Sequence, residues 1–395
     1  MAYRFNRMEI AGSLGDLGVL LPMAMGMIMV NGLSAQGLFF AVGLFYILSG
    51  VYFGIPVSVQ PMKVIGSYAI AMSLARDQIL AAGLTTGALL LAIGLTGTMG
   101  LITRLIPRPV IRGVQLSTGL LLMFQGMQMV LGKSSFQTQH KLAEPFLSIQ
   151  SIGPIPLTWV LGAAALFLTF VFLRSPRFPA GLVVVGFGLL AGLILGNGTV
   201  ILGARMGLPE IMPSGLPSTA SFVTAMLVLT LPQIPMTLGN AVIANVDLAQ
   251  QYFGDEAKRT TGKALCVSMG LANIGSFLLG GMPMCHGAGG LAAHYRFGAR
   301  TAGSNIIIGT LFAGMALVLG DSILGVTELV PMSVLGILLF FAGSELAITV
   351  GDVKERKNLF VCLAVTGITL ASNLAVGFVT GAAVHYVLRS DRMAV

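Results

Sequence analysis

Residues 56–63 read Pro56-Val57-Ser58-Val59-Gln60-Pro61-Met62-Lys63, and residues 283–290 read Pro283-Met284-Cys285-His286-Gly287-Ala288-Gly289-Gly290. Both stretches interrupt long apolar runs. Two prolines five positions apart cannot both lie inside a regular helix, because proline lacks a backbone N–H and clashes with the preceding turn. We therefore predict extended backbone over residues 57–60 and a helix that begins near Pro61, since proline suits the first helical position. The second stretch predicts the same arrangement, with glycines that leave the backbone N–H groups accessible.

The composition places these two breaks inside a membrane. The chain has 395 residues, of which 55% are hydrophobic and only 9% charged, and its mean hydropathy is +0.91. A soluble domain carries about 25% charged residues, whereas a bilayer requires apolar segments of roughly 20 residues, and such segments recur along the whole length. Lipid is therefore the natural solvent for this chain. We predict a single polytopic membrane unit over residues 1–395.

We predict fourteen helical membrane segments, of which the third and the tenth are interrupted. Their approximate ranges are 10–30, 36–54, 56–74, 79–102, 108–131, 155–173, 179–197, 219–245, 264–281, 285–298, 303–320, 328–349, 358–372 and 373–389. With a cytoplasmic N-terminus, seventeen of the 22 Lys and Arg residues lie on the cytoplasmic side and four outside, and Lys63 lies inside the membrane. This bias follows the positive-inside rule and predicts that both termini are cytoplasmic.

The two halves of the chain resemble each other. Gly54-Ile55-Pro56 opens the third segment and Gly281-Met282-Pro283 opens the tenth, and prolines also match between segments five and twelve and between segments one and eight. Because seven spans is an odd number, the second half must be inserted upside down relative to the first. Inverted repeats with interrupted segments at matching positions are typical of secondary transporters.

Two helix N-termini that meet in the membrane favour an anion. Each helix start offers unpaired N–H donors and about half a positive charge, and Lys63 adds a full charge in the first turn of its helix. An ionisable residue inside the membrane indicates a functional site. Snorkelling of Lys63 to an interface and tight helix packing through the glycines are the structural alternatives.

Further polar residues accompany the breaks. In segment eight, Gln233, Thr237 and Asn240 share one face at α-helical spacing, where they either donate to oxyanion oxygens or form interhelical hydrogen bonds. Asp16 in segment one either pairs with Lys63, takes part in proton coupling or caps its span. Gln115 in segment five is a further candidate for the cavity wall.

Several classes of site and function lack support in the sequence. Cys285, His286 and His294 are too few and too unusually spaced for a zinc site, so we expect no bound metal. The sequence has neither a phosphate-binding lysine loop nor a catalytic set, and we expect neither an enzyme nor a cofactor. The net charge of +8 is topogenic and does not indicate nucleic acid, because the basic residues lie in short loops between spans.

The same blocks resemble a known family. Residues 56–63, residues 231–244 with their Pro-Met-Thr-Leu-Gly-Asn-Ala-Val centre, and residues 283–292 are similar to the molybdate transporters of the MOT type, which are related to the SulP sulfate permeases. The resemblance covers nearly the whole chain. It implies the fourteen-span fold shared by sulfate permeases and nucleobase symporters, with a core domain at about 8–104 and 219–321 and a gate domain at about 105–218 and 322–390. Because the chain stops soon after the last span, we expect no STAS domain.

We therefore predict a secondary transporter of a tetrahedral oxyanion, with molybdate first and sulfate or tungstate as alternatives, that works by alternating access. The residues expected to bind the anion are Ser58, Val59, Gln60, Lys63, Thr237, Asn240, Cys285, His286, Gly287, Ala288 and Gly289, and Asp16 is the candidate for coupling. A proton-coupled nucleobase symporter and a passive anion channel are the competing interpretations. Residues 222–245 and 283–295 contain no carboxylate that could grip a neutral base, which favours the anion. We expect a bacterial inner-membrane location, and a homodimer through the gate domain is the candidate assembly.

Overall fold

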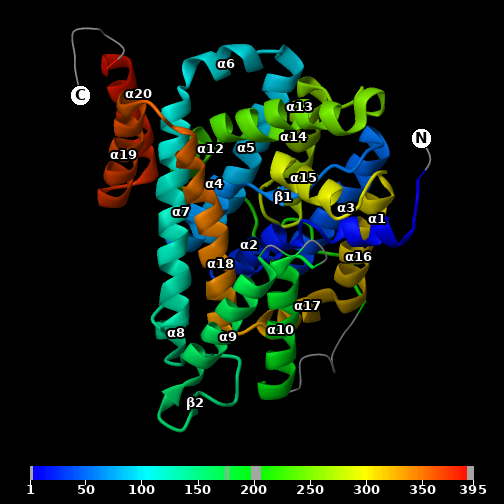
Figure 1. The fold of residues 1–395 in the computed structure, drawn as a ribbon, viewed down its shortest axis with the longest axis vertical. Coiled ribbons are helices and arrows are strands. Elements are labelled where there is room, and N and C mark those ends of the chain that lie inside the picture. The colour runs from blue at the N-terminus through cyan, green and yellow to red at the C-terminus, as the bar shows by residue number, and fades with distance from the viewer. Residues whose placement is uncertain (1–2, 174, 176–177, 197–205, 389–395) are drawn as a thin grey trace.

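The computed structural model describes residues 3–173, 175, 178–196 and 206–388 as a bundle of helices (Figure 1). Within these residues, 7 helical runs are long and apolar enough to cross a membrane, and shorter apolar helices of 10–17 residues accompany them. The prediction of an all-α multi-pass membrane protein is confirmed. Five residues used in the charge argument lie outside the described residues, namely Arg174, Arg177, Arg205, Arg389 and Arg392.

The first predicted segment is not one continuous helix. It consists of α1 (Arg7–Ser13) and α2 (Leu17–Met29), and the turn between them places Asp16 at the start of α2. The run Arg7–Met29 is still long and apolar enough for one span, and its first helix passes very close to the loop that follows α15 (Ala288–Arg296). A Cβ atom on Gly12 would lie 2.2 Å from the backbone nitrogen of Ala299, so only glycine permits this approach.

The remaining elements of the first half follow the predicted segments within a few residues. They are α3 (Ala35–Phe53), β1 (Gln60–Pro61), α4 (Lys63–Ala71), α5 (Arg76–Thr96), α6 (Met99–Leu105), α7 (Arg108–Val130), α8 (Ser135–His140), β2 (Ser151–Ile152), β3 (Ile155–Pro156), α9 (Leu157–Phe172) and α10 (Ala180–Leu195). The third segment is interrupted as predicted, although its helix begins at Lys63 and not at Pro61, because Pro61 pairs with a second strand.

The second half begins with a long helical run that contains two π-helical stretches and ends in a 3₁₀ turn. It contains α11 (Thr219–Thr224), η1 (Ala225–Thr230), α12 (Leu231–Met236), η2 (Thr237–Ile243), α13 (Ala244–Phe253) and η3 (Gly254–Ala257). Both η1 and η2 are π-helices, in which i→i+5 hydrogen bonds put more residues into each turn. α-Helical spacing therefore does not decide which side chains share a face beyond Met236.

The other elements of the second half form the breaks and the last spans. They are α14 (Gly262–Leu278), β4 (Met284–Cys285), α15 (Ala288–Arg296), α16 (Gly303–Leu319), η4 (Gly320–Ser322), α17 (Ile323–Glu328), α18 (Met332–Ala347), η5 (Ile348–Asp352), α19 (Arg356–Ala371) and α20 (Leu374–Leu388). The tenth segment is extended through Gly287 and helical from Ala288, as the sequence predicts.

Helices from the two halves pack in pairs. α7 and α18 run side by side along the long axis of the molecule, with α19 and α20 outside α7 (Figure 1). Small residues bring their backbones together: a Cβ on Gly126 would lie 2.4 Å from the carbonyl oxygen of Gly336, and one on Gly119 would lie 2.6 Å from that of Gly343. α3 packs against α16, and α5 packs against α14. These close contacts are characteristic of helix packing in membranes.

Candidate functional site

The two interrupted segments meet at a short antiparallel ladder. Strand β1 pairs with β4, with Gln60 opposite Cys285 and Pro61 opposite Met284, and the N–H of Met62 donates to Pro283 O at 2.9 Å. Residues far apart in the sequence thus hold both helix starts at one place inside the bundle. The sequence predicted the two breaks and their proximity, but not the ladder that joins them.

Two asparagines hold the extended residues in place. Asn305 on α16 accepts from the N–H of Val57 at 3.1 Å and donates to Val57 O at 2.7 Å. Asn273 on α14 makes the same two contacts with Met284, both at 2.8 Å. Each amide replaces the partners that a helix would supply, because buried backbone groups must be hydrogen-bonded. Sequence reasoning missed both residues, although a lone amide in an apolar helix is the signal that could have revealed them.

The N-terminus of α15 is the open helix start of the site. Gly287 is its N-cap residue, and its carbonyl accepts from the Ser58 hydroxyl at 2.7 Å. Within the described chain, no protein acceptor lies at the N–H groups of Ala288 and Gly289. Gly289 is exposed, and a Cβ built on it would meet nothing within 4 Å. This helix start therefore has donors without protein acceptors next to the accessible Gly289, an arrangement that suits an anion.

Gly287 is different from Gly289. A Cβ on Gly287 would lie 2.0 Å from Gln60 Oε1, and one on Gly290 would lie 2.5 Å from both Asp16 Oδ2 and Ser58 Cβ. These two glycines thus permit close packing of the breaks. The sequence left two roles open for these glycines, which were close helix packing and access of an anion to the backbone. Gly287 and Gly290 have the packing role, whereas Gly289 is accessible.

The N-terminus of α4 is occupied by a side chain of the protein. Gln233 Oε1 accepts from the N–H groups of Val64 at 3.0 Å and Ile65 at 3.1 Å, and its Nε2 donates to Thr237 Oγ1 at 2.9 Å. The amides of this first turn are thus already satisfied. The positive contribution of α4 to the site comes mainly from the half-buried Lys63, which acts electrostatically on Asp16 and Cys285.

Asp16 lies directly behind the breaks. Its Oδ1 accepts from Gln60 Nε2 at 2.5 Å, its side chain is buried, and its Oδ2 has no hydrogen-bond partner in the described residues. A buried carboxylate with an unpartnered oxygen is costly when ionised. The arrangement suits a group that takes up and releases a proton.

His286 and Cys285 support the ladder and do not face open space. His286 is fully buried, its Nδ1 lies 2.8 Å from Ser58 O and its Nε2 lies 3.0 Å from Ser268 Oγ. Cys285 Sγ lies 3.9 Å from Pro61 O, and Val59 O accepts from the Tyr46 hydroxyl at 3.2 Å. Among the residues that the structure describes, no group of three His, Cys, Asp or Glu side chains could hold a metal ion.

Asn240 lies apart from Gln233 and Thr237. Thr237 is buried and contacts Gln233, whereas Asn240 lines a cavity of about 390 Å³ between η2 and α7, where Gln115 lines the other wall. The face predicted from α-helical spacing therefore holds for Gln233 and Thr237 but not for Asn240. The π-helical backbone of η2 explains the difference.

Comparison with known sequences identifies several relatives. The family described as "Molybdate transporter of MFS superfamily" matches residues 8–122 and 225–346. "Molybdate transporter 1" of Arabidopsis thaliana is 30% identical over 98% of this chain and 89% of its own length. "Molybdate transporter 2" of the same plant is 32% identical over 96% and 87%, and "Molybdate transporter 1" of Chlamydomonas reinhardtii is 31% identical over 94% and 89%.

Solved structures with a similar fold are anion transporters. The transmembrane domain of the cyanobacterial bicarbonate transporter BicA superposes with a TM-score of 0.66 at 17% identity, and covers 96% of this chain and 98% of that domain. Murine Slc26a9 in its inward-facing state gives the same TM-score at 14% identity, over 98% of this chain and 69% of that protein. At these identities the likeness concerns the fold, and it confirms the fold class expected from the sequence.

Proposed function

Since the chain belongs to the molybdate transporter family, we propose that it is a secondary transporter of a tetrahedral oxyanion. Molybdate is the first candidate for the substrate, and sulfate and tungstate are the alternatives. The open N-terminus of α15 carries the proposal. Its N–H groups at Ala288 and Gly289 have no protein acceptor in the described residues, and Gly289 is exposed. Backbone donors and the helix dipole bind an anion there without a side chain.

In this proposal, the predicted site residues divide into two groups. Ala288 and Gly289 donate to the anion, and Lys63 supplies the compensating charge. Ser58, Val59, Gln60, Cys285, His286 and Gly287 hold the ladder and the helix start in position, and Gln233 and Thr237 brace α4. Asn240 lines a separate cavity between η2 and α7.

We further propose that Asp16 couples transport to protons. Its Oδ2 lacks a partner among the described residues, and Gln60, which holds its Oδ1, belongs to the ladder itself. Protonation of Asp16 would remove a negative charge beside the anion site. A proton and an anion would then favour each other's binding, because linkage between two sites is reciprocal.

The proposed architecture consists of fourteen spans in two inverted repeats, divided into the core domain (about 8–104 and 219–321) and the gate domain (about 105–218 and 322–390). The helix pairs support this division: α3 packs on α16 and α5 on α14 within the core, and α7 packs on α18 within the gate. Movement of the gate past the core would expose the site alternately to the two sides.

We propose a bacterial inner-membrane location with both termini in the cytoplasm and a homodimer formed through the gate domain. The distribution of Lys and Arg in the sequence supports the orientation. A proton-coupled nucleobase symporter and a passive anion channel are the other two functions for which this fold is suited. The open helix N-terminus favours an anion over a neutral base, and a flux measurement separates transporter from channel.

Uptake into proteoliposomes that contain the full-length protein tests the proposed function. Molybdate inside the vesicles is counted by mass spectrometry in the presence of sulfate, tungstate or uracil as competitors. We expect molybdate uptake against its own concentration gradient when an inward proton gradient is imposed. Flux that only follows the anion gradient would indicate a channel, and inhibition by uracil but not by oxyanions would indicate a nucleobase symporter.

A further inference from the structure

The cavity of about 390 Å³ between α7 and the η2–α13 run lies away from the two breaks. Its polar and charged lining consists of Arg108, Arg112 and Gln115 on α7, and of Asn240 and Asp247 on the opposite wall. The lining thus contains two guanidinium groups and one carboxylate, and a second carboxylate, Asp352, pairs with Arg112. The guanidinium and amide N–H groups of this lining suit a small anion better than a cation or an apolar ligand.

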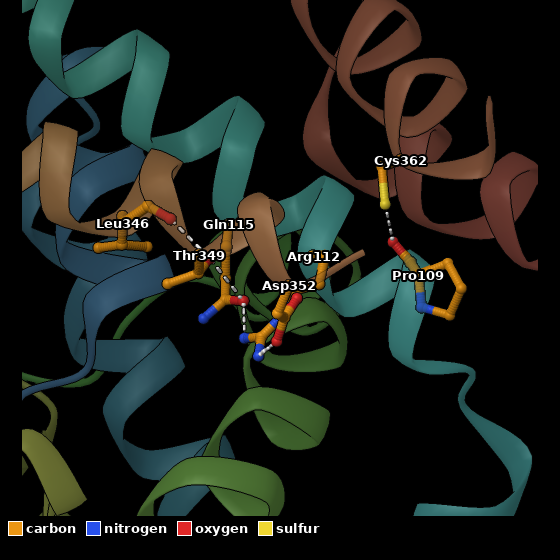
Figure 2. A network of polar contacts seen from close by, with 7 residues as sticks. All are labelled: Pro109, Arg112, Gln115, Leu346, Thr349, Asp352 and Cys362. Carbon is orange, nitrogen blue, oxygen red and sulfur yellow. Dashed lines mark hydrogen bonds and ion pairs between the residues drawn. The ribbon is translucent and has the colours of Figure 1, made fainter. Parts of the chain in front are cut away.

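Gln115 presents a fixed N–H donor to this cavity. Its Oε1 accepts from Arg112 Nη1 at 2.8 Å and from Thr349 Oγ1 at 3.2 Å. An arginine can only donate, so the oxygen of the amide must face Arg112 and the nitrogen must face the other way. Figure 2 shows the Gln115 nitrogen turned away from the guanidinium, and no acceptor contacts it within the described part of the chain. The Gln115 residue as a whole is only 4% exposed, so protein surrounds most of its side chain.

Arg112 is held by the carboxylate of Asp352, the last residue of η5. Its Nε lies 2.9 Å and 3.1 Å from the two oxygens of Asp352, and its Nη2 also donates to Oδ2 (Figure 2). The side chains of this pair are 31% and 56% exposed, and exposed ion pairs are worth little because water competes for both partners. Arg112 can therefore exchange part of its contact with Asp352 for another anion.

The opposite wall leaves room for a ligand. Asn240 makes no side-chain hydrogen bond in the described residues, and a Cβ on its neighbour Gly239 would meet nothing within 4 Å. An anion beside Gln115 could therefore also accept from the Asn240 amide. The cavity thus has donors on both walls, one on the proposed gate domain and one on the proposed core.

We propose that this cavity is a second, weaker oxyanion site, in which Gln115 Nε2 and the Arg112 guanidinium bind the ion and Asp352 competes with it for Arg112. The proposal rests on the proposed function, since the ligand is the transported oxyanion. Competition from Asp352 keeps the affinity low, so that the ion passes between the α15 helix start and the solvent and is not trapped. If the Arg112–Asp352 pair only fastened α7 to η5, its removal would change stability and not anion binding.

Equilibrium dialysis of the full-length protein in lipid nanodiscs tests the second site. Molybdate, sulfate and tungstate are each used as the probe, and the bound ion is counted per chain. We expect two classes of binding. Gln115→Met should weaken the weaker class roughly tenfold, as expected for the loss of a hydrogen bond to a charged group. Asp352→Asn should strengthen the same class by about fivefold, because it removes a competing charge at close range.

Two control variants make the result specific. Asp77→Asn neutralises a carboxylate that is 45% exposed and lies next to Arg76, outside this cavity, and should leave both classes unchanged. Lys63→Gln should weaken the tighter class alone. A single class of binding that Asp352→Asn and Gln115→Met leave unchanged would refute the second site while the proposed function stands. Failure of the native protein to bind any of the three ions would refute both.

Discussion

The Nε2 atom of Gln60 donates to Asp16 Oδ1 at 2.5 Å, which ties the ladder at the two breaks directly to the only buried carboxylate described beside them. Next to the ladder, the Ser58 hydroxyl donates to the carbonyl of Gly287, the N-cap residue of α15. A change in the protonation of Asp16 would therefore affect Gln60 first, and through Gln60 the ladder that holds the proposed anion-binding helix start.

Replacement of Asp16 by Asn tests the proposed proton coupling. Asn cannot gain or lose a proton, but it can still accept from Gln60 through its oxygen. We expect the Asp16→Asn protein to bind molybdate and to lose the acceleration of uptake by an inward proton gradient. Uptake into proteoliposomes at equal and unequal pH provides the measurement. Equal stimulation of the variant and the native protein by the gradient would exclude Asp16 as the coupling residue.

Substitution of Gly289 tests which glycine borders the anion. A Cβ at this position meets nothing within 4 Å, so Gly289→Val should fold and should block the space that an oxyanion oxygen needs. In a helix Val costs about 0.7 kcal/mol relative to Ala and Gly about 1 kcal/mol, so the exchange itself should not destabilise α15. We expect normal thermal stability and at least tenfold weaker molybdate binding, a loss of about 1.4 kcal/mol or more.

Gly287→Ala is the matched comparison. Its Cβ would lie 2.0 Å from Gln60 Oε1, so the Gln60 side chain must move and the ladder must distort. We expect a lower melting temperature as well as weaker binding. A Gly289→Val protein that binds molybdate with native affinity would show that the anion does not sit at the start of α15.

Glu144, in the connection between α8 and α9, predicts a pH-dependent stability. Its carboxylate accepts from the N–H of Met332 at 2.7 Å and from the N–H of Ser333 at 3.0 Å at the start of α18. Burial raises the pKa of Glu144 to about 7, and its hydrogen bonds with Ser333 and Met332 oppose that rise only in part. The folded protein therefore holds the proton more tightly than the unfolded chain.

The sign of the effect follows from this raised pKa. The contribution of Glu144 to stability is fully present below the ordinary glutamate pKa of 4.5 and is lost as the pH rises through about 7, a change of about 3 kcal/mol at most. We expect the melting temperature to fall between pH 5 and pH 8, and Glu144→Gln to flatten this profile. If the variant keeps the native profile, another group causes the pH dependence.

Single cysteines test the proposed orientation. Lys141, Lys258 and Lys354 are exposed, and the native Cys266, Cys285 and Cys362 are buried. Lys141 is a better position than Gln137, whose buried side chain bonds to Ser134. We expect a membrane-impermeant maleimide to label Lys141→Cys from outside in intact cells, and to label Lys258→Cys and Lys354→Cys only after the membrane is opened. External labelling of Lys354→Cys would refute the fourteen-span topology.

Several features of this protein could be predicted from the sequence because local chemistry decides them. Proline prevents a regular helix at residues 56–61 and at Pro283, so the breaks were evident without any tertiary information. The apolar runs and the basic loops likewise indicate a multi-pass membrane protein. The small residues after Pro283 predicted the open helix start at Ala288 and Gly289.

Only the tertiary structure decided which group each polar side chain bonds to. Gln233 occupies the start of α4, and Asn305 and Asn273 hold the extended residues, through contacts between positions that are far apart in the chain. The same applies to Arg112, whose partner Asp352 is 240 residues away. Whether an amide faces a ligand, a backbone group or a cavity depends on the packing of neighbouring helices and on local departures from α-helical geometry such as η2. Neither is contained in the spacing of residues along one segment.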